Sequence, residues 1–315
     1  MKNPTLVLDC MNIFIRCYAA NPKMSAQGFH VGGVVGFLKT LRGVCNKFSP
    51  GQIVAVWEGG GSSRRRSIYS EYKRGKKPKR MNRFYEDDIP DSEKNKNFQI
   101  ATLISLLKHL PICQVYVSDC ECDDVIGYLC QYTLKDKQKM IISSDQDYYQ
   151  LLNQNTQIYR LGKKEIVSAE DVLGLTGVTA SNYCLAKCLV GDSSDNIKGI
   201  KGAGFKSVSK RFPDLASEKE CNLNEILKTA SEKYDEKIKL YREVADNFDI
   251  VKRNWRLIYL NTKNLAANQM SQINHIIDTF EVRRNKISLM RGLIKIGVQS
   301  LDVEALMLSM IYIEE

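Results

Sequence analysis

The chain has 315 residues, 43% of them hydrophobic, so it can bury a substantial core and form one large and one smaller domain. Its formal net charge of +10 favours a polyanionic partner. The three histidines, His30, His109 and His275, are widely scattered, which disfavours a histidine-based zinc site and a Ser-His-Asp triad.

Five short apolar runs predict buried strands, and the first four end at or just before an acidic residue. These runs cover 5–9, 52–58, 114–118, 140–143 and 156–161, and the acidic residues are Asp9, Glu58, Glu121 and Asp145. Helical spacing between the runs predicts an α/β fold with a mostly parallel sheet flanked by helices. The predicted helices include 13–18, 34–44 and 98–110. Because ligands bind at the carboxyl ends of parallel strands, the acidic residues could share one pocket.

Five of the carboxylates in the stretch 118–152 fall into two tight sets. Glu121, Asp123 and Asp124 begin a predicted helix, whereas Asp145 and Asp147 follow an apolar strand and would point the same way if strand geometry continued. Two like charges about 4 Å apart repel by roughly 4 kcal/mol at an effective dielectric of about 20. Capping residues and solvated loop charges are one interpretation. We favour a site for Mg²⁺ or Mn²⁺, because other strands bring carboxylates to the same edge.

The most basic tract lies between the second strand and the helix at 98–110. Residues 64–83 include ten Lys or Arg and a single acidic residue, Glu71, with Tyr69 and Tyr72 interleaved. A solvated surface is the plain alternative. Basic and aromatic residues beside an acidic edge fit better with an element that grips a nucleic-acid strand, in which cations pair with phosphates and rings stack on bases. We place this basic element at about 62–97.

A second informative tract covers 191–208. Asp192 and Asp195 lie three residues apart, and Gly199, Gly202 and Gly204 follow in the order GxxGxG, which matches neither common nucleotide-binding loop. A glycine-rich connector is the alternative. We favour a hairpin whose backbone amides contact duplex phosphates and which leads directly into a helix.

The last third of the chain is charged and helical in pattern. Helical spacing covers 218–230, 232–247, 270–280, 286–296 and 300–313. We therefore predict an α/β domain over 1–180 and a helical C-terminal domain over 181–315. The ten cysteines lie within apolar patterns without a CxxC pair, which is typical of reduced core residues of a cytoplasmic protein. We expect no signal peptide and no membrane span.

In this order and spacing, the motifs resemble those of the flap-endonuclease-like 5′-nucleases, which are 5′→3′ exonucleases, over about 6–208. The acidic motifs that carry the resemblance are Asp9 through Asn12 (D-G-x-N), Glu58 at the second strand end, Glu121 to Asp124 (E-x-D-D) and Ser144 to Asp147 (G-D-x-D). Two further motifs contribute. One is the basic element, hereafter the basic arch, in which Arg65, Tyr72, Lys73 and Lys76 are similar to the R…YK..R tract of the family's helical arch. The other is Gly191 to Asn196 with the glycines that follow, which is similar to a helix–three-turn–helix motif at about 184–212.

Three positions depart from the family pattern. Cys10 replaces the glycine after the first aspartate, and Glu58 stands where Asp is more common. The Gly202-Ala203-Gly204 turn is closer to the general family than to its T-even branch. The compact length and the helical last third nevertheless resemble most closely the T-even-type phage ribonuclease H.

The resemblance implies an enzyme that hydrolyses phosphodiesters of DNA or RNA–DNA hybrid at a 5′ flap or nick and removes RNA primers and flaps in replication, with ribonuclease H activity expected. It implies two Mg²⁺, or Mn²⁺, held by nine carboxylates: Asp9, Glu58, Glu121, Asp123, Asp124, Asp145, Asp147, Asp192 and Asp195. The implied catalytic residues are Lys73 and Arg65, which would neutralise the scissile phosphate, with Asp145 at the metals. The implied DNA contacts are Arg65, Tyr72, Lys73, Lys76, Gly199, Lys201, Gly202, Gly204 and Lys206.

Further expectations are a K⁺ ion at the turn 199–204, a monomeric state, a single-strand-binding protein as partner, and a cytoplasmic location, which would be the host cytoplasm if a phage encodes the chain.

Two alternative functions stay open. One is a non-catalytic, structure-specific DNA-binding protein that keeps the fold. Loss of the key carboxylates would favour this alternative, but all of these carboxylates are present. The other is a PIN-type ribonuclease, against which the basic arch and the glycine tract argue.

Overall fold

The computed structural model describes residues 2–61, 63–74 and 93–313. Within these residues the centre is a six-stranded sheet of order β3-β2-β1-β4-β5-β6. The strands are β1 Thr5–Asp9, β2 Gln52–Trp57, β3 Cys113–Tyr116, β4 Lys139–Ile142, β5 Thr156–Arg160 and β6 Glu165–Val167. The first five strands pair parallel with one another, and β6 pairs antiparallel with β5. The predicted mostly parallel sheet is therefore confirmed.

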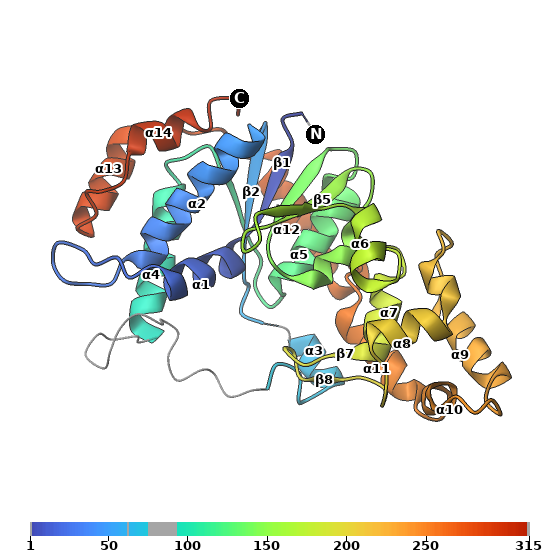
Figure 1. Cartoon of the computed structure of the whole chain (residues 1–315). Helices are drawn as coiled ribbons and strands as arrows, with labels where there is room; N and C mark the ends of the chain where they lie inside the picture. Colours follow the sequence, from blue (N-terminus) through green and yellow to red (C-terminus); the bar gives the residue numbers. More distant parts are fainter. Residues whose placement is uncertain (1, 62, 75–92, 314–315) are drawn as a thin grey trace.

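The central strand β1 is buried along its whole length. Its side chains alternate between two cores, because Leu6 and Leu8 join one hydrophobic cluster and Val7 joins the other. Both faces of the sheet are consequently covered by helices, as the continuous apolar sequence of the strand requires. Figure 1 shows α1 Cys10–Ala20, α2 Gly32–Phe48 and α4 Glu93–Leu107 on one side and α5 Cys122–Tyr128 on the other.

The remaining helices agree with the sequence patterns in part. Those after the sheet are α6 Ala169–Thr176, α7 Tyr183–Val190, α8 Phe205–Arg211, α9 Leu223–Glu232, α10 Lys239–Asp246, α11 Phe248–Ile258, α12 Ala267–Asp278, α13 Lys286–Lys295 and α14 Val303–Leu308. The helix predicted over 232–247 was wrong in its first half, because a turn follows α9 before α10 begins. The pattern also missed the short helix α3 Ser63–Ile68, whose charged sequence has little apolar periodicity.

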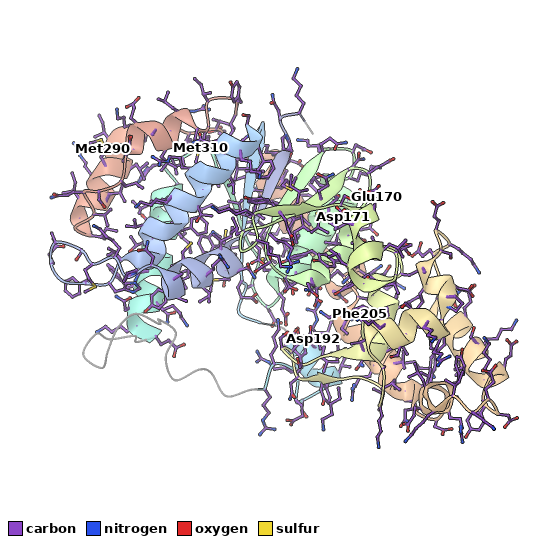
Figure 2. The ribbon with its side chains drawn as sticks, in the orientation of Figure 1. Glu170, Asp171, Asp192, Phe205, Met290 and Met310 are labelled. Carbon is purple, nitrogen blue, oxygen red and sulfur yellow. The ribbon has the colours of Figure 1, made fainter. Side chains whose placement is uncertain are left out.

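The last three helices return to the α/β layer. Helix α12 packs against β3, α13 against α4, and α14 against α2. Leu289 and Leu306 share a hydrophobic cluster with Leu6 of β1. Met290 and Met310 mark this part of the chain beside α2 in Figure 2. The division at residue 180 stays a prediction, and the packing joins the end of the chain to the first unit.

The glycine tract differs in detail from the prediction. Its antiparallel hairpin is formed by β7 Gly191–Asp192 and β8 Ile197–Lys198, and the segment 199–204 is the turn from β8 into α8. A Cβ atom at Gly199 would lie 2.1 Å from the carbonyl oxygen of Val190, so the close approach there is to the chain's own backbone. Gly202 has φ +81° with open space around it.

Two sequence expectations concern the whole chain. All ten cysteines are free and buried, which confirms that they are core residues. Among the helices that the structure describes, none has the length and apolarity needed to cross a membrane.

Candidate functional site

Asp9 stands at the end of β1 and caps helix α1. Its Oδ1 accepts a hydrogen bond from the backbone amide of Asn12 at 3.1 Å, and its Oδ2 accepts one from the Ser143 hydroxyl at 2.9 Å. The hydroxyl of Tyr148 lies 3.3 Å from Asp9 Oδ2 and 2.8 Å from Asp123 Oδ1. Because this hydroxyl has one proton, it can donate to only one of the two carboxylates at a time. Tyr148 therefore ties the end of β1 to the start of α5.

An open cleft of about 720 Å³ lies over this edge of the sheet. Asp9, Asp123 and Asp145 line it together with Lys73, so strand ends far apart in the sequence meet as predicted. A second hollow of about 440 Å³ contains Lys187 and Asp192 and shares Asp145 with the first. Asp192 and Phe205, which are labelled in Figure 2, both line the second hollow. The two hollows therefore adjoin at Ser144 and Asp145.

The carboxylates of the cleft are crowded and short of solvent. Burial, with the negative charge of Asp145 next in importance, holds the pKa of Asp123 well above its usual range. Burial also raises the pKa of Asp145 and of Asp9. Such a site is costly while its carboxylates are charged, and a bound cation would offset that cost. The donors are all oxygen, which suits Mg²⁺ or Mn²⁺, so the residues fit the metals that the sequence implies.

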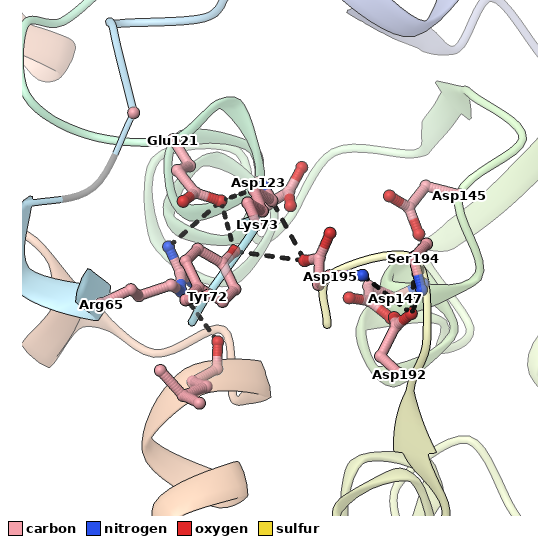
Figure 3. Close-up of polar contacts among 12 residues, drawn as sticks. Arg65, Tyr72, Lys73, Glu121, Asp123, Asp145, Asp147, Asp192, Ser194 and Asp195 are labelled. Atoms are coloured by element: carbon pink, nitrogen blue, oxygen red, sulfur yellow. Dashed lines mark hydrogen bonds and ion pairs between the residues drawn. The ribbon is translucent and has the colours of Figure 1, made fainter. Parts of the chain in front are cut away.

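Tyr72 and Lys73 contact both Glu121 and Asp195, as Figure 3 shows. The Nζ atom of Lys73 lies 2.6 Å from Glu121 Oε2 and 3.9 Å from Asp195 Oδ2. The Tyr72 hydroxyl lies 2.8 Å from the same Glu121 oxygen and 3.2 Å from Asp195 Oδ2. Lys73 also donates its backbone amide to the Asp195 carbonyl at 2.9 Å while its φ is +52°. This left-handed residue therefore holds its ammonium group at the cleft wall.

Arg65 is paired with a carboxylate of the chain itself. Its side chain is buried, and two of its nitrogens bind the Asp124 carboxylate at 2.5 and 2.8 Å. Its Nε donates to the Leu257 carbonyl at 2.8 Å. In this arrangement Arg65 and Asp124 bind each other, and the predicted contacts of Arg65 with phosphate and of Asp124 with metal stay predictions. The pair bridges α3, α5 and α11.

The second acidic set comprises Asp147, Asp192 and Asp195, which offer oxygens within 4.8 Å of one another. Lys187 contacts Asp147 and lies 2.7 Å from Asp192 Oδ2. The side chains of Asp145 and Asp147 do not continue a strand as predicted, because β4 ends at Ile142 and a 3₁₀ helix covers Gln146–Leu151. Asp145 caps that helix by accepting the Asp147 amide at 2.9 Å. Asp145 consequently lies with Asp9 and Asp123 in the first hollow, whereas Asp147 lies with Asp192 and Asp195.

Sequence reasoning missed Lys187 and Tyr148. A signal for Lys187 existed, since it is the single charged residue in the otherwise apolar sequence of α7. Tyr148 has no comparable signal, because its 3₁₀ helix is too short to show a clear period.

The other predicted site residues lie in three places. Glu58 supports the loops around the cleft, since its carboxylate accepts the Gly61 amide at 3.2 Å and the Cys122 amide at 3.4 Å. Lys201 and Lys206 are exposed on the turn after β8 and on α8. Lys76 and much of the predicted arch lie outside the described residues. The predicted metal contact of Glu58 and the predicted DNA contacts of the three lysines stay predictions.

Comparison with known proteins decides the family. The model of the 5′-3′ exonuclease N-terminal, resolvase-like domain matches residues 4–177, more than half of the chain. The chain belongs to the 5′-3′ exonuclease family. Members include the 5′-3′ exonuclease of Aquifex aeolicus, which is 30% identical over 203 residues, or 64% of this chain and 66% of that one. The flap endonuclease Xni of Shewanella loihica is 28% identical over 225 residues, or 68% of this chain and 79% of that one.

A solved structure confirms the fold of this exonuclease-family chain. The bacteriophage T5 flap endonuclease in a complex with DNA and metal ions superposes with a TM-score of 0.71 at 17% identity, over 87% of this chain and 98% of the T5 chain. The match includes the helical part of the chain as well as the sheet. Membership of the T-even ribonuclease H branch stays a prediction.

Proposed function

We propose that the protein is a metal-dependent 5′ nuclease, both 5′→3′ exonuclease and flap endonuclease, that hydrolyses phosphodiesters of DNA or RNA–DNA hybrid at a 5′ flap or nick. One observation carries the proposal: Asp9, Asp123 and Asp145, from three separate segments, line a single cleft with Lys73 at its wall. The net charge of +10 supports a polyanionic substrate despite this acidic cleft. The T5 flap endonuclease, whose fold this chain shares, was crystallised with DNA and metal ions.

Two Mg²⁺ ions, with Mn²⁺ as an alternative, are the proposed cofactors. Asp9, Asp123 and Asp145 would hold one, and Asp147, Asp192 and Asp195 form the second proposed set. When bound, such ions polarise the phosphate and lower the pKa of water. The second set holds Lys187 in the structure, so a metal there would compete with this ammonium group for Asp147 and Asp192.

The chain's own residues would position the substrate. Burial opposes the charge of Lys73, but the carboxylates of Asp123 and Glu121 outweigh it and raise the pKa of Lys73. Lys73 therefore stays protonated and can place positive charge where a phosphate enters the cleft. The Tyr72 hydroxyl orients Glu121, which in turn orients Lys73. Arg65 is proposed to act as a positioning residue, because it holds Asp124 and thereby the first turn of α5.

The turn 199–204 and α8 are the proposed anchor for downstream duplex. Gly202 leaves its backbone open, and Lys201 and Lys206 are exposed beside it. A K⁺ ion at this turn, ribonuclease H activity, a role in removing RNA primers, and a single-strand-binding partner are finer parts of the same proposal.

The test is cleavage of a 5′-labelled flap duplex and of a labelled RNA–DNA hybrid, each with Mg²⁺ and with EDTA. We expect products only with Mg²⁺, and their loss in Asp145→Asn. Asp249→Asn is the matched control, because Asp249 is almost fully exposed on α11. Binding without cleavage in Mg²⁺ and in Mn²⁺ would identify a non-catalytic binder. Faster cleavage of single-stranded RNA than of either duplex would favour a PIN-type ribonuclease instead.

A further inference from the structure

A basic pocket lies between α3 and the end of α11. It has a volume of about 310 Å³, within the range of small-ligand pockets. Its cations are Arg64, Arg256 and Lys263, and its described lining includes no carboxylate. It shares no described lining residue with the two acidic hollows. Figure 1 shows α3 beside α11 at the end of the molecule away from α13 and α14.

One cation of this pocket, Arg64, has a buried donor without an acceptor among the described residues. The Nη1 atom of Arg64 is buried, yet it makes no hydrogen bond with any residue that the structure describes. A buried donor without an acceptor costs free energy, and a guanidinium more than a neutral group. Burial, followed by the charge of Arg65, lowers the pKa of Arg64; Arg256 adds to this effect and Asp124 opposes it. An anion in the pocket would supply the missing acceptor and relieve this repulsion.

Aromatic rings stand beside the cations. Trp255 and Tyr259 line the pocket and stack on each other, with ring centroids 4.1 Å apart and planes 22° from parallel. Both rings are partly exposed. Cations that pair with phosphate next to rings that can stack on a base are the combination that binds single-stranded nucleic acid without sequence preference. A paired base has its faces covered by its neighbours in the duplex, so an unpaired nucleotide is the better fit.

We propose that the pocket formed by Arg64, Trp255, Arg256, Tyr259 and Lys263 binds a nucleotide of single-stranded nucleic acid, outside the acidic cleft. Its phosphate contacts the cations, and its base stacks on the aromatic pair. The site is adjacent to the Arg65–Asp124 bridge, since Asn264 lines the pocket and donates to Asp124 Oδ1 at 2.8 Å. The proposal does not depend on hydrolysis, so it can be tested without cleavage.

The sequence offers a direct probe of this site. The chain has two tryptophans, and Trp57 is buried in β2, so a Trp57→Phe background leaves Trp255 as the only source of tryptophan fluorescence. The full chain in this background is titrated with oligothymidylate of four nucleotides in EDTA, which prevents metal-dependent cleavage. We expect quenching of Trp255 fluorescence that saturates. The abasic tetranucleotide should bind more weakly by about fivefold or more, because it lacks the stacking base.

Two variants separate the pocket from general electrostatics. Arg256→Gln should weaken oligothymidylate binding about fivefold. Lys252→Gln removes the same charge one helical turn earlier on α11, where Lys252 lies near Asp249, and should change binding less than twofold. Both side chains are exposed, and equal melting temperatures will show that both variants fold.

Four outcomes would overturn the proposal. They are the absence of quenching, an equal loss of affinity in both variants, equal binding of the abasic strand, and equal competition by inorganic phosphate or by polyglutamate. The last would assign the pocket to a free anion or to an acidic peptide. A failure here would leave the proposed hydrolysis untouched, because cleavage is measured with Mg²⁺ on the flap substrate.

Discussion

Replacing Arg65 by methionine tests whether this residue positions the site or contacts the substrate. Arg65→Met keeps most of the apolar stem but removes the charge that binds the buried carboxylate of Asp124. Loss of one partner of a buried ion pair costs about 3–5 kcal/mol. Asn264 still donates to Asp124, so we expect a loss near the lower limit, about 3 kcal/mol. At roughly 2 °C per kcal/mol, the melting temperature should fall by about 6 °C.

The assay is calorimetric melting in EDTA of Arg65→Met, of Asp124→Asn and of the double variant. Asparagine keeps the oxygen that accepts from Asn264 but carries no charge. The double variant should therefore recover roughly 2 kcal/mol relative to the sum of the single losses, because no buried charge is left alone. If Arg65→Met melts at the wild-type temperature but loses cleavage, Arg65 contacts the phosphate and the bridge is not its role.

Further expectations concern the cleft and the glycine turn. Asp123→Asn should abolish cleavage and change flap binding less than about twofold. It should also raise the melting temperature of the metal-free protein by roughly 2 °C, because it removes one of several like charges that are buried together. A lower melting temperature would contradict this reasoning. Lys73→Ala should slow single-turnover cleavage by roughly a hundredfold, whereas Arg74→Ala, whose side chain is exposed, should not; equal effects would reduce Lys73 to a general electrostatic role. Gly199→Ala should unfold the turn, seen by circular dichroism and melting, because its Cβ has no space. Gly202→Ala should cost only about 1 kcal/mol yet weaken binding of a nicked duplex, and unchanged affinity would exclude the turn as anchor.

The sequence predicts the sheet and the edge of the site because both depend on local patterns. Asp9 and Asp145 follow apolar strands, and parallel strands bring their ends together without further information. The partners of Arg65 could not be predicted, since its contact with the Leu257 carbonyl joins residues 192 positions apart. A motif shows that a cation is present, but burial decides whether it faces substrate or a carboxylate.

The separate positions of Asp145 and Asp147 teach a similar lesson. Their spacing of two fits a strand, and only the end of β4 at Ile142 shows that the chain has already turned. Element boundaries depend on packing, which local sequence specifies poorly. The same limit applies to Lys187. Its helix places it between Asp147, which is distant in the sequence, and Asp192, which is near in the sequence.

The bridge formed by Arg65 also bears on how the enzyme is made. Asp124 is held by a residue that binds the Leu257 carbonyl and by the amide of Asn264, 140 positions later. The ribosome must therefore synthesise more than four fifths of the 315 residues before this bridge can form. Contacts of such long sequence separation form slowly, after the local helices. A nascent chain, which is surrounded by messenger and ribosomal RNA, consequently carries Asp124 before the bridge that holds it has formed.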